Sequence, residues 1–395
     1  MKKTISIIGG GPSSLLLAAF LDAEKFDITI YEKNKTVGRK FLVAGKGGFN
    51  LTHSEPISEL IEKYTPNSVL KDSLLYFTND DFRNWLHRIE IPTYIGSSKR
   101  VYPKEGIKPI TVLKTITNHL KQKGIIFKYE HTFSDWDSKN NLIINNKIIS
   151  SDYTVFSLGG GSWKITGSDG TWLEKFQQKG INTIPFEASN CTFKIDWDSE
   201  FILKNEGNPL KNITVTCSGK TQKGEAVITN FGLEGNAVYG LSPQIRAQLK
   251  SKNKAFVTID FKPTITLETV ISKIVSSKFK NTTQILKKEL RLSSSQISLL
   301  KTYLPKEAYL NPNLLSKNIK NFPLEIIDLS ILDEAISTVG GVDLNAVDAH
   351  FQLHEMPNQF CIGEMLNWDA PTGGYLLQAC ASNGVFLAKY FNEIE

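Results

Sequence analysis

The turn at Gly9-x-Gly11-x-x-Ser14 constrains this chain more than any other feature of its sequence. It joins a short β-branched run to an apolar stretch with helical spacing. A second β-rich run follows and ends at Glu32, 21 residues beyond Gly11. Strand, glycine turn, helix and strand in this spacing predict a β-α-β unit, which requires a parallel sheet.

The same turn has the chemistry of a dinucleotide site. Gly9 permits a tight turn, Gly11 lets the backbone approach a pyrophosphate, and the following helix start offers unpaired N–H groups to the anion. Ser14 replaces the third glycine of the usual pattern, and its small side chain still allows the helix to pack closely on the strand. An acid at position 32 accepts hydrogen bonds from ribose hydroxyls. The cofactor-binding residues predicted here are Gly9, Gly11, Pro12, Ser13, Ser14, Glu32 and Lys33.

A loop rich in Gly, Lys and Asn, from Gly38 to His53, has little periodicity. We expect it to be extended and to lie on a ligand, because cationic side chains neutralise phosphate charge and glycines bring backbone N–H groups close to a planar ring. A solvated loop is the alternative interpretation. The residues predicted to contact the cofactor are Arg39, Lys40, Gly45, Lys46, Gly47 and Asn50.

Two further glycine clusters follow strand signals later in the chain. One follows the run Tyr153–Leu158, and the other is a Gly-acid pair at 363–364 with a Gly-Gly helix start at 373–374. We call the segment from Gly363 to Tyr375 the C-terminal return, because it leads the chain back to the cofactor site. NAD enzymes do not need such a segment, whereas a flavin does. Glu364 can bond the ribityl chain, and the helix dipole favours negative charge on the reduced ring. These stretches predict FAD and add Gly159, Gly363, Glu364, Gly373, Gly374, Tyr375 and Leu376 to the site.

Over essentially its whole length the sequence resembles the BaiN-like flavoproteins, also called the aminoacetone oxidase family of FAD-binding enzymes, which are bacterial. The resemblance rests on the stretches 9–14, 38–53, 100–103, 158–161, 166–170, 363–364 and 372–375. Many relatives have Arg-Cys-Asn where this chain has Gly48-Phe49-Asn50, and Asn in place of Leu376. The chain therefore resembles a side branch with the loop GRKFLxAGxGGxNxTHSE, and chemistry that depends on that Arg or Cys is not carried over.

The resemblance implies an α/β fold: a discontinuous Rossmann-like FAD-binding domain, an inserted β-barrel-like domain and a small helical domain. The sequence texture agrees, since short alternating strands run from about 190 to 262 and a Lys-rich helical stretch follows to about 335. We expect the FAD-binding domain at 1–190 and 336–395, the β domain at 191–263 and the helical domain at 264–335.

The predicted function is that of an FAD-dependent oxidoreductase that passes electrons to an unidentified substrate, either a small molecule whose carbon–carbon double bond is reduced or, as an alternative, uridine in ribosomal RNA. NAD(P)H is expected as a transient electron donor. Activities of the resembled family include reduction of enone-type carbon–carbon double bonds and of uridine in ribosomal RNA. The alternatives are an NAD(P)-dependent dehydrogenase and a non-catalytic flavin-binding protein. No catalytic acid is assigned: His53 fits capping or packing, and His350 with His354 fits a solvated hairpin better than a metal site.

The charge and composition of the chain limit the classes of partner that we expect it to bind. The segment 273–306 contains eight Lys and Arg against one acid, Glu289, a balance of plus seven that exceeds the +6 of the whole chain. A solvated helical face is the usual meaning of such a run, and contact with a structured RNA is the alternative. No apolar stretch approaches the ~20 residues that span a bilayer, and the four cysteines form no C-x-x-C pair. We expect a cytoplasmic protein without a membrane partner.

Overall fold

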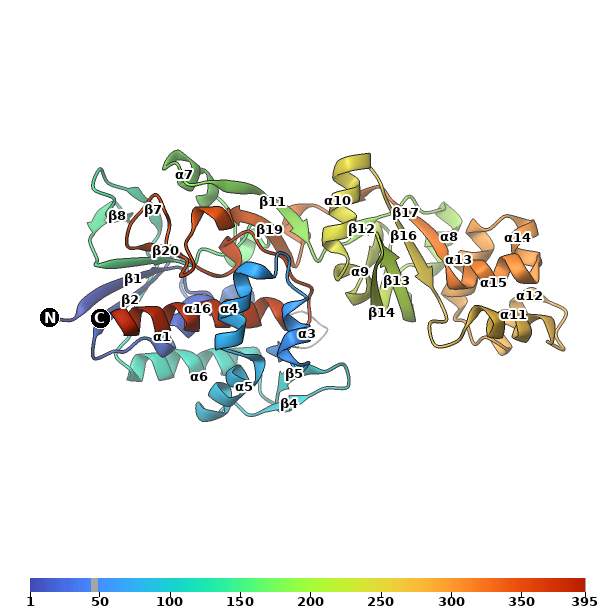
Figure 1. Cartoon of the computed structure of the whole chain (residues 1–395), viewed down its shortest axis with the longest axis horizontal. Coiled ribbons are helices and arrows are strands. Elements are labelled where there is room, and N and C mark those ends of the chain that lie inside the picture. Colours follow the sequence, from blue (N-terminus) through green and yellow to red (C-terminus); the bar gives the residue numbers. More distant parts are fainter. Residues whose placement is uncertain (44–48, 395) are drawn as a thin grey trace. The chain divides into compact units, whose positions relative to one another are not determined.

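The computed structural model describes residues 1–43 and 49–394, which form two compact units (Figure 1). The first unit is discontinuous and comprises Met1–Glu187 and Ile336–Glu395. The second comprises Ala188–Ala335. The chain leaves the first unit through β11 (Thr183–Ser189) and returns through β19 (Ser337–Val342), and these two strands pair with each other. The division of the inserted region into a β domain and a helical domain stays a prediction.

A five-stranded parallel sheet forms the centre of the first unit. Its order is β20-β10-β1-β2-β6, with Ile7 of β1 opposite Ile30 of β2 and Val155 of β10. All three side chains are fully buried, because helices cover both faces of a parallel sheet. The strands span Lys3–Ile8 (β1), Phe26–Glu32 (β2), Ile126–Tyr129 (β6), Tyr153–Phe156 (β10) and Gln359–Cys361 (β20).

The first and last helices of the chain pack on each other beside this sheet (Figure 1). They are α1 (Pro12–Phe20) and α16 (Tyr375–Ile394). Gly384 lies at their crossing, where a β-carbon would overlap the backbone of Ser13 and Leu17. The close approach ties the C-terminal part of the chain to the glycine turn at the start of α1.

The remaining elements of the first unit are shorter. Two antiparallel three-stranded sheets have the orders β3-β5-β4 and β7-β8-β9, and the predicted break at Asn145-Asn146 separates β8 from β9. The bounds are Arg39–Leu42 (α2), Thr52–His53 (β3), Ile57–Ile61 (α3), Ser68–Tyr76 (α4), Asn79–Arg88 (α5), Thr93–Ile95 (β4), Arg100–Pro103 (β5), Pro109–Gln122 (α6), Phe133–Trp136 (β7), Leu142–Ile144 (β8), Lys147–Ile149 (β9) and Trp172–Gln178 (α7).

The loop after Gly38 is less extended than the sequence predicted. Residues Arg39–Leu42 form one helical turn, with the Leu42 N–H donating to the Gly38 carbonyl at 3.2 Å. Gly38 has a φ of 64°, a conformation that favours glycine, and this lets the chain enter the turn directly after a sharp bend. Of the predicted contacts in this loop, Gly45, Lys46 and Gly47 lie outside the described residues.

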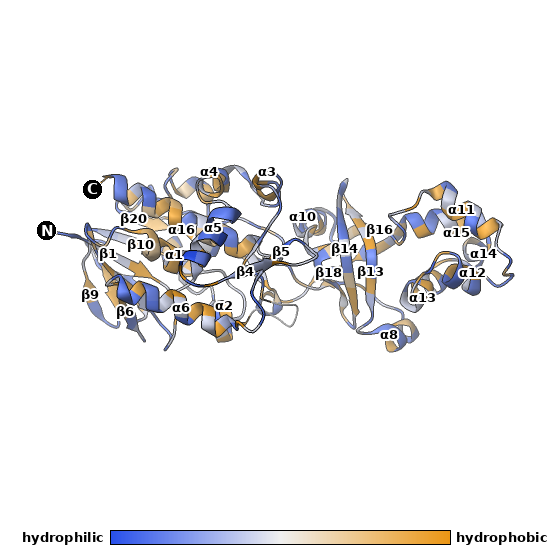
Figure 2. Cartoon of the chain, turned by 90° about the horizontal axis from the view of Figure 1, so that it is seen from below, coloured by the Kyte–Doolittle hydropathy of each residue, from blue (hydrophilic) through white to orange (hydrophobic). Residues whose placement is uncertain are grey.

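The second unit is built on a seven-stranded antiparallel sheet of order β17-β16-β13-β14-β15-β12-β18. The strands at the two ends of this order, β17 and β18, are consecutive in the sequence and are separated by Ile327 alone. The Ile327 N–H donates to the Lys194 carbonyl of β12, so the sheet closes on itself as a barrel-like layer. Figure 2 shows hydrophobic and polar residues alternating along β13 and β16. The residues on one face of these strands are buried. The strands are Phe193–Lys194 (β12), Pro209–Cys217 (β13), Lys220–Thr229 (β14), Gly232–Glu234 (β15), Ala255–Asp260 (β16), Phe322–Ile326 (β17) and Asp328–Leu329 (β18).

Helices of the second unit share a hydrophobic core with this sheet. The Lys-rich helical stretch ends at Lys320 rather than near 335, because Phe322–Ile326 alternates buried and exposed residues and joins the sheet as β17. The helices are Ser199–Asn205 (α8), Asn236–Tyr239 (α9), Ser242–Lys252 (α10), Leu267–Val275 (α11), Thr282–Lys288 (α12), Ser294–Tyr303 (α13), Lys306–Leu310 (α14) and Pro312–Lys320 (α15).

Candidate functional site

A cavity of about 310 Å³ lies in the first unit at the edge where the parallel strands end. Its lining includes the glycine turn after β1, the residues after β2 and the segment after β10. Because the carboxyl ends of parallel strands meet at one edge of a sheet, segments far apart in the sequence converge there. The cavity therefore lies where open α/β sheets bind their ligands.

The glycine turn forms one wall of this cavity. Gly9 has a φ of 98°, and a β-carbon there would overlap the Ser157 carbonyl of the neighbouring β10 segment. The Ser14 hydroxyl donates to the Gly9 carbonyl at 2.5 Å, and it thereby holds the turn against the helix. A β-carbon on Gly11 would meet nothing within 4 Å, so the backbone at Gly11 is open to the cavity. This geometry fits an anion placed against the first turn of α1.

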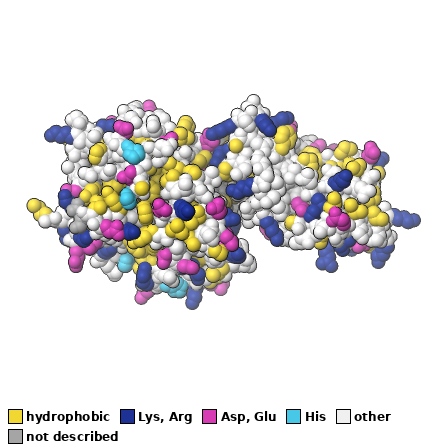
Figure 3. All heavy atoms as spheres, in the orientation of Figure 1, with side chains coloured by type: hydrophobic (Ala, Val, Ile, Leu, Met, Phe, Trp, Pro, Cys, Tyr) yellow, Lys and Arg dark blue, Asp and Glu magenta, His cyan; other side chains and the backbone are white. Residues whose placement is uncertain are grey.

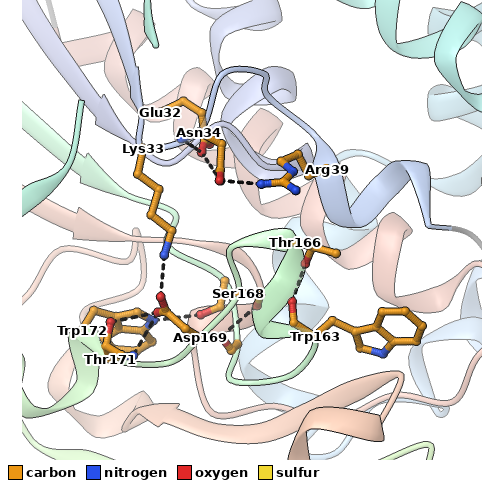
Figure 4. A network of polar contacts seen from close by, with 12 residues as sticks. Glu32, Lys33, Asn34, Arg39, Trp163, Thr166, Ser168, Asp169, Thr171 and Trp172 are labelled. Carbon is orange, nitrogen blue, oxygen red and sulfur yellow. Dashed lines mark hydrogen bonds and ion pairs between the residues drawn. The ribbon is translucent and has the colours of Figure 1, made fainter. Parts of the chain in front are cut away.

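Glu32 is fixed at the end of β2 by hydrogen bonds to both carboxylate oxygens. Its Oε2 accepts from the Gly10 N–H at 2.9 Å, and its Oε1 accepts from the Asn34 backbone and side chain at 2.8 and 2.7 Å. Arg39 donates to the Asn34 side-chain oxygen at 2.7 Å, as Figure 4 shows. The carboxylate is therefore held in place before any ligand arrives, and Glu32 forms part of the cavity lining.

A second group of polar residues closes the cavity from the segment after β10. Lys33 reaches Asp169 at 2.8 Å, and Thr171 donates its hydroxyl to the same carboxylate at 2.8 Å (Figure 4). Burial opposes ionisation of Asp169, but hydrogen bonds from Lys33 and Thr171 outweigh it and lower its pKa. The ion pair thus links β2 to the loop 166–170 across the cavity.

A second cavity, of about 380 Å³, shares part of its lining with the first. Lys40 lies at the junction, where its ammonium is 3.1 Å from Glu364 Oε2 and 3.0 Å from the Ser162 hydroxyl. Beyond this pair the second cavity is bordered by apolar side chains and by a few polar ones. The residues common to both cavities are Pro12, Lys40, Phe41, Glu364 and Cys380.

The C-terminal return forms the far wall of the second cavity. Gly373 and Gly374 have φ values of 118° and 105°, and a β-carbon on Gly374 would overlap the backbone of Thr52. Tyr375 turns away from the cavity: its ring stacks on His53 with centroids 5.0 Å apart, and 7% of the residue is exposed. The return therefore brings glycine backbone, rather than the tyrosine ring, to the lining.

Most of the predicted cofactor-binding residues that the structure describes lie on one or both cavities. Three do not line either cavity: Ser14 closes the glycine turn, Gly363 packs against Ser13, and Tyr375 packs on His53. Those on a cavity wall are Gly9, Gly11, Pro12, Ser13, Glu32, Lys33, Arg39, Lys40, Asn50, Gly159, Glu364, Gly373, Gly374 and Leu376.

Several cavity-lining residues were not predicted from the sequence, and three of them carry groups that matter for the chemistry of the site. Asp169 lies in a stretch that carried the family resemblance, so a signal existed although no role was assigned to it. Cys380 was interpreted as a buried small hydrophobe, but it lines both cavities. Arg100 lies in another resembling stretch and lines the second cavity. Arg100 does not adjoin a glycine motif in the sequence, whereas Asp169 lies between Gly167 and Gly170.

The histidines considered earlier have packing partners. His53 pairs with Glu55, with 3.6 Å between Nδ1 and Oε1, and burial lowers its pKa although Glu55 acts in the opposite direction. His350 stacks on Tyr390 at 4.2 Å. Within residues 1–43 and 49–394, no group of three or more His, Cys, Asp or Glu is arranged to hold a metal ion.

The site fits FAD on the evidence of these cavities. An open glycine backbone at the start of α1 suits the pyrophosphate, a fixed Glu32 suits the adenosine ribose, and the Lys40–Glu364 pair lies where the lining continues toward the flavin end. The family profile described as "HI0933-like protein Rossmann domain" matches residues 3–390. The chain belongs to this family. It is a flavoprotein, an FAD-dependent oxidoreductase with a Rossmann FAD-binding domain.

Two similar proteins are full-length matches to this member of the family. One, named "Ribosomal RNA dihydrouridine synthase", is from Haemophilus influenzae; it is 24% identical, with 94% of each chain covered. The other, named "3-dehydro-bile acid delta(4,6)-reductase", is from Clostridium scindens; it is 23% identical, with 98% of each chain covered. A solved 3-ketosteroid-delta4-(5alpha)-dehydrogenase from Rhodococcus jostii is 12% identical, with a TM-score of 0.45 over 98% of this chain and 97% of that one.

No helix in the described part of the chain is both long and apolar enough to cross a membrane.

Proposed function

We propose that this protein uses FAD to reduce a carbon–carbon double bond that is conjugated to a carbonyl group. The observation that carries the proposal is the second cavity. Apart from the Lys40–Glu364 pair its wall is largely apolar, and its apolar side chains include Phe41, Ile336, Leu376 and Leu377. A wall of this kind suits a flat, mostly apolar substrate lying against a ring system.

The two similar proteins support the same reaction class. Dihydrouridine differs from uridine by two hydrogens across a carbon–carbon double bond next to a carbonyl, and a delta(4,6)-reductase is named for reducing carbon–carbon double bonds. Both names therefore describe addition of a hydride and a proton to a double bond, although the two molecules differ widely in size. We propose NAD(P)H as the electron donor, bound transiently because one dinucleotide motif is present in the sequence.

In this proposal the chemistry supplied by bound FAD is two-electron hydride transfer. The protein contributes binding and orientation. The turn at Gly9–Ser14 holds the pyrophosphate, Glu32 the ribose, and Glu364 the ribityl chain, with Lys40 balancing its charge. The apolar side chains of the second cavity exclude water from the substrate and hold it against the ring.

The test is anaerobic reoxidation of the reduced holoprotein. Purified protein is reduced with NADPH or dithionite and then mixed with cyclohexenone, androstenedione or, as a control, the saturated ketone cyclohexanone. We expect the enones to restore the yellow flavin absorbance within seconds to minutes and cyclohexanone to leave it bleached. Equal rates with the saturated ketone, or no reoxidation by the enones, would falsify the proposed double-bond chemistry.

A second candidate is the reduction of uridine in a structured RNA. The eight basic residues of 273–306 are all exposed on α11, α12, α13, α14 and the connecting segments of the second unit. Figure 3 shows Lys and Arg side chains protruding from the end of that unit. A basic face of this kind can neutralise phosphates and release counterions. The salt dependence that would separate this candidate from a small-molecule substrate is argued in the Discussion.

We propose a cytoplasmic setting. None of the four cysteines, all within the described residues, forms a disulfide, as is usual for proteins of a reducing compartment.

A further inference from the structure

Arg100 places a positive charge on the wall of the second cavity. It begins β5 and is partly buried, and its guanidinium lies against Gly373 of the C-terminal return. A β-carbon on Gly373 would be 3.3 Å from Arg100 Nε and 3.7 Å from Nη2. A glycine at this position therefore makes room for the guanidinium at the cavity surface.

Arg100 has no carboxylate partner among the described residues, in contrast to Lys40, the other cation on the wall of the second cavity. Lys33 pairs with Asp169 and Lys40 pairs with Glu364. Among the described residues, no hydrogen bond or ion pair joins the Arg100 side chain to another group. The nearby carboxylate of Glu55 instead faces His53 and Tyr375. A partly buried guanidinium without a partner is a site for an oxygen with negative charge.

The surrounding residues fix the backbone from which the Arg100 side chain extends. Arg100 is directly opposite His53 in the β3–β5 pairing, so both side chains project from the same face of that sheet. His53 is stacked on Tyr375, and the Tyr64 hydroxyl donates to the Tyr375 carbonyl at 2.8 Å. These contacts anchor the wall from which the guanidinium extends.

We infer that Arg100 binds the carbonyl oxygen of the substrate, and that the substrate places one oxygen on Arg100 and an apolar body against Leu376 and Ile336. The inference rests on the proposed function and adds a substrate class to it: a largely apolar compound with a single recognised carbonyl oxygen. It also assigns a catalytic contact, because the charge on that oxygen grows during the reaction.

The electron balance follows the addition of hydride to a conjugated double bond. A carbon–hydrogen bond forms at the carbon β to the carbonyl, with the hydride that reduced FAD would supply. The π electrons of the carbon–carbon double bond form a new double bond between the α-carbon and the carbonyl carbon, and the π electrons of the carbonyl group move to its oxygen. The guanidinium N–H groups of Arg100 donate to the resulting enolate oxygen. A proton from water then adds to the α-carbon, which restores the carbonyl and leaves hydroxide. Donors placed where charge develops stabilise the transition state more than the bound substrate.

A phenolate tests this contact without turnover. Para-chlorophenol, titrated into the oxidised holoprotein, presents an anionic oxygen on a flat ring and produces long-wavelength charge-transfer absorbance when it lies over a flavin. We expect Arg100→Gln to weaken phenolate binding roughly tenfold to a hundredfold. FAD content and midpoint potential should stay those of the wild type. Arg88→Gln, at an exposed position of the same unit, is the matched control and should bind phenolate normally.

Steady-state kinetics with cyclohexenone add a second measurement. Arg100→Gln should lower kcat more than it raises KM, since the contact strengthens as the enolate forms. Arg100→Lys keeps the charge but loses the paired donors, so it should fall between the wild type and the glutamine variant. It also keeps the test available if the glutamine variant is poorly folded.

The outcomes separate this inference from the proposed function. Enone reduction with phenolate affinity in Arg100→Gln within about twofold of the wild type would overturn the role of Arg100 alone. Loss of FAD or a shifted midpoint potential in that variant would assign Arg100 to the cofactor instead, and would also overturn it. A wild-type protein that holds FAD but neither reduces enones nor binds phenolate would refute the proposed function, and the inference with it.

Discussion

Glu364 and His53 both lie near the flavin end of the site, but they have different surroundings. Glu364 lines both cavities and pairs with Lys40, whereas His53 stacks on Tyr375 behind the wall. We expect Glu364→Ala to weaken FAD retention by about 1–3 kcal/mol, because it removes an acceptor and leaves the Lys40 charge without its partner. His53→Ala should change FAD affinity much less. The dissociation constants follow from fluorescence titration of apoprotein with FAD.

Glu364→Gln serves as the control for shape in this comparison. It keeps the hydrogen-bonding atoms but not the charge, so its FAD affinity should lie between those of the wild type and Glu364→Ala. Equal FAD affinities of the Glu364→Ala and His53→Ala variants would show that the C-terminal return does not anchor the cofactor.

The thiol of Cys380 lies in surroundings that make it unreactive toward alkylating reagents. Burial, the largest cause, raises the pKa of its thiol to about 12, and the Glu364 carboxylate acts in the same direction. The thiol is therefore protonated at neutral pH, and we expect iodoacetamide to modify Cys380 negligibly between about pH 7 and pH 9 in folded protein. Peptide mass mapping after alkylation measures this directly, with urea-unfolded protein as the fully reactive control. Rapid modification of native Cys380 would mean that the cavity wall opens readily.

At the scale of elements, the crossing of α1 and α16 links the two ends of the first unit. Gly384→Ala places a methyl group against the backbone of Ser13 and Leu17, which cannot rotate away as a side chain can. The overpacking cost of about 1–3 kcal/mol exceeds the gain of about 1 kcal/mol in helix propensity. We expect lower stability and weaker FAD retention, because the same backbone leads into the glycine turn.

Urea unfolding followed by tryptophan fluorescence measures this effect. Five of the six tryptophans lie in the first unit, so the signal reports mainly on that unit. Glu393→Ala, at the exposed end of α16, should change the unfolding free energy by less than about 0.5 kcal/mol. An unchanged midpoint for Gly384→Ala would show that the helices move apart at little cost.

Local patterns predicted most elements of the fold, but not all of them. The strands and helices around Gly9 and Glu32 follow directly from hydrophobic spacing and glycine position. The segment Phe322–Ile326 was expected to be helical because it follows a Lys-rich helical stretch. Its alternation is only five residues long, and its pairing with β16 comes from a distant part of the chain. Pairing between strands that are distant in the sequence is hard to predict from a segment of only a few residues.

The residues of the candidate site also fall into two groups, those that the sequence predicted and those that it did not. Glu32 ends β2, and Glu364 follows Gly363 in the turn after β20, so sequence spacing was sufficient to single them out. Arg100 and Asp169 reach the cavities only because β5 packs beside the C-terminal return and because Lys33 pairs across the first cavity. Their roles depend on contacts between segments that are far apart in the sequence, and composition or spacing carries no record of those contacts.

At the scale of the whole molecule, charge is unevenly distributed. With plus seven in 273–306 and +6 over the chain, the rest of the protein is close to neutral. If the second unit binds RNA, Lys280, Lys287 and Lys288 changed to Glu should lower the salt slope of binding by about two to three, since each lost phosphate contact contributes about 0.7–0.9. Filter binding of a structured RNA across salt concentrations measures the slope.

The control carries the same charge change elsewhere in the same unit: Lys204, Lys220 and Lys223, all exposed, changed to Glu. A slope reduced equally by both sets would indicate general electrostatic attraction rather than a defined RNA face. A slope unchanged by the first set, with the flavin spectrum intact, would leave the segment as a solubilising surface and favour the small-molecule substrate.

The discontinuity of the first unit has a consequence for how the protein is made on the ribosome. Its first 187 residues contain the glycine turn and Glu32, but β20, Glu364 and α16 emerge only after the whole inserted unit has been synthesised. A nascent chain can therefore complete the inserted unit while its cofactor domain still lacks an edge strand and a covering helix. Stable retention of FAD therefore has to wait for the synthesis of β20, Glu364 and α16, and chains released before that point would leave the ribosome colourless.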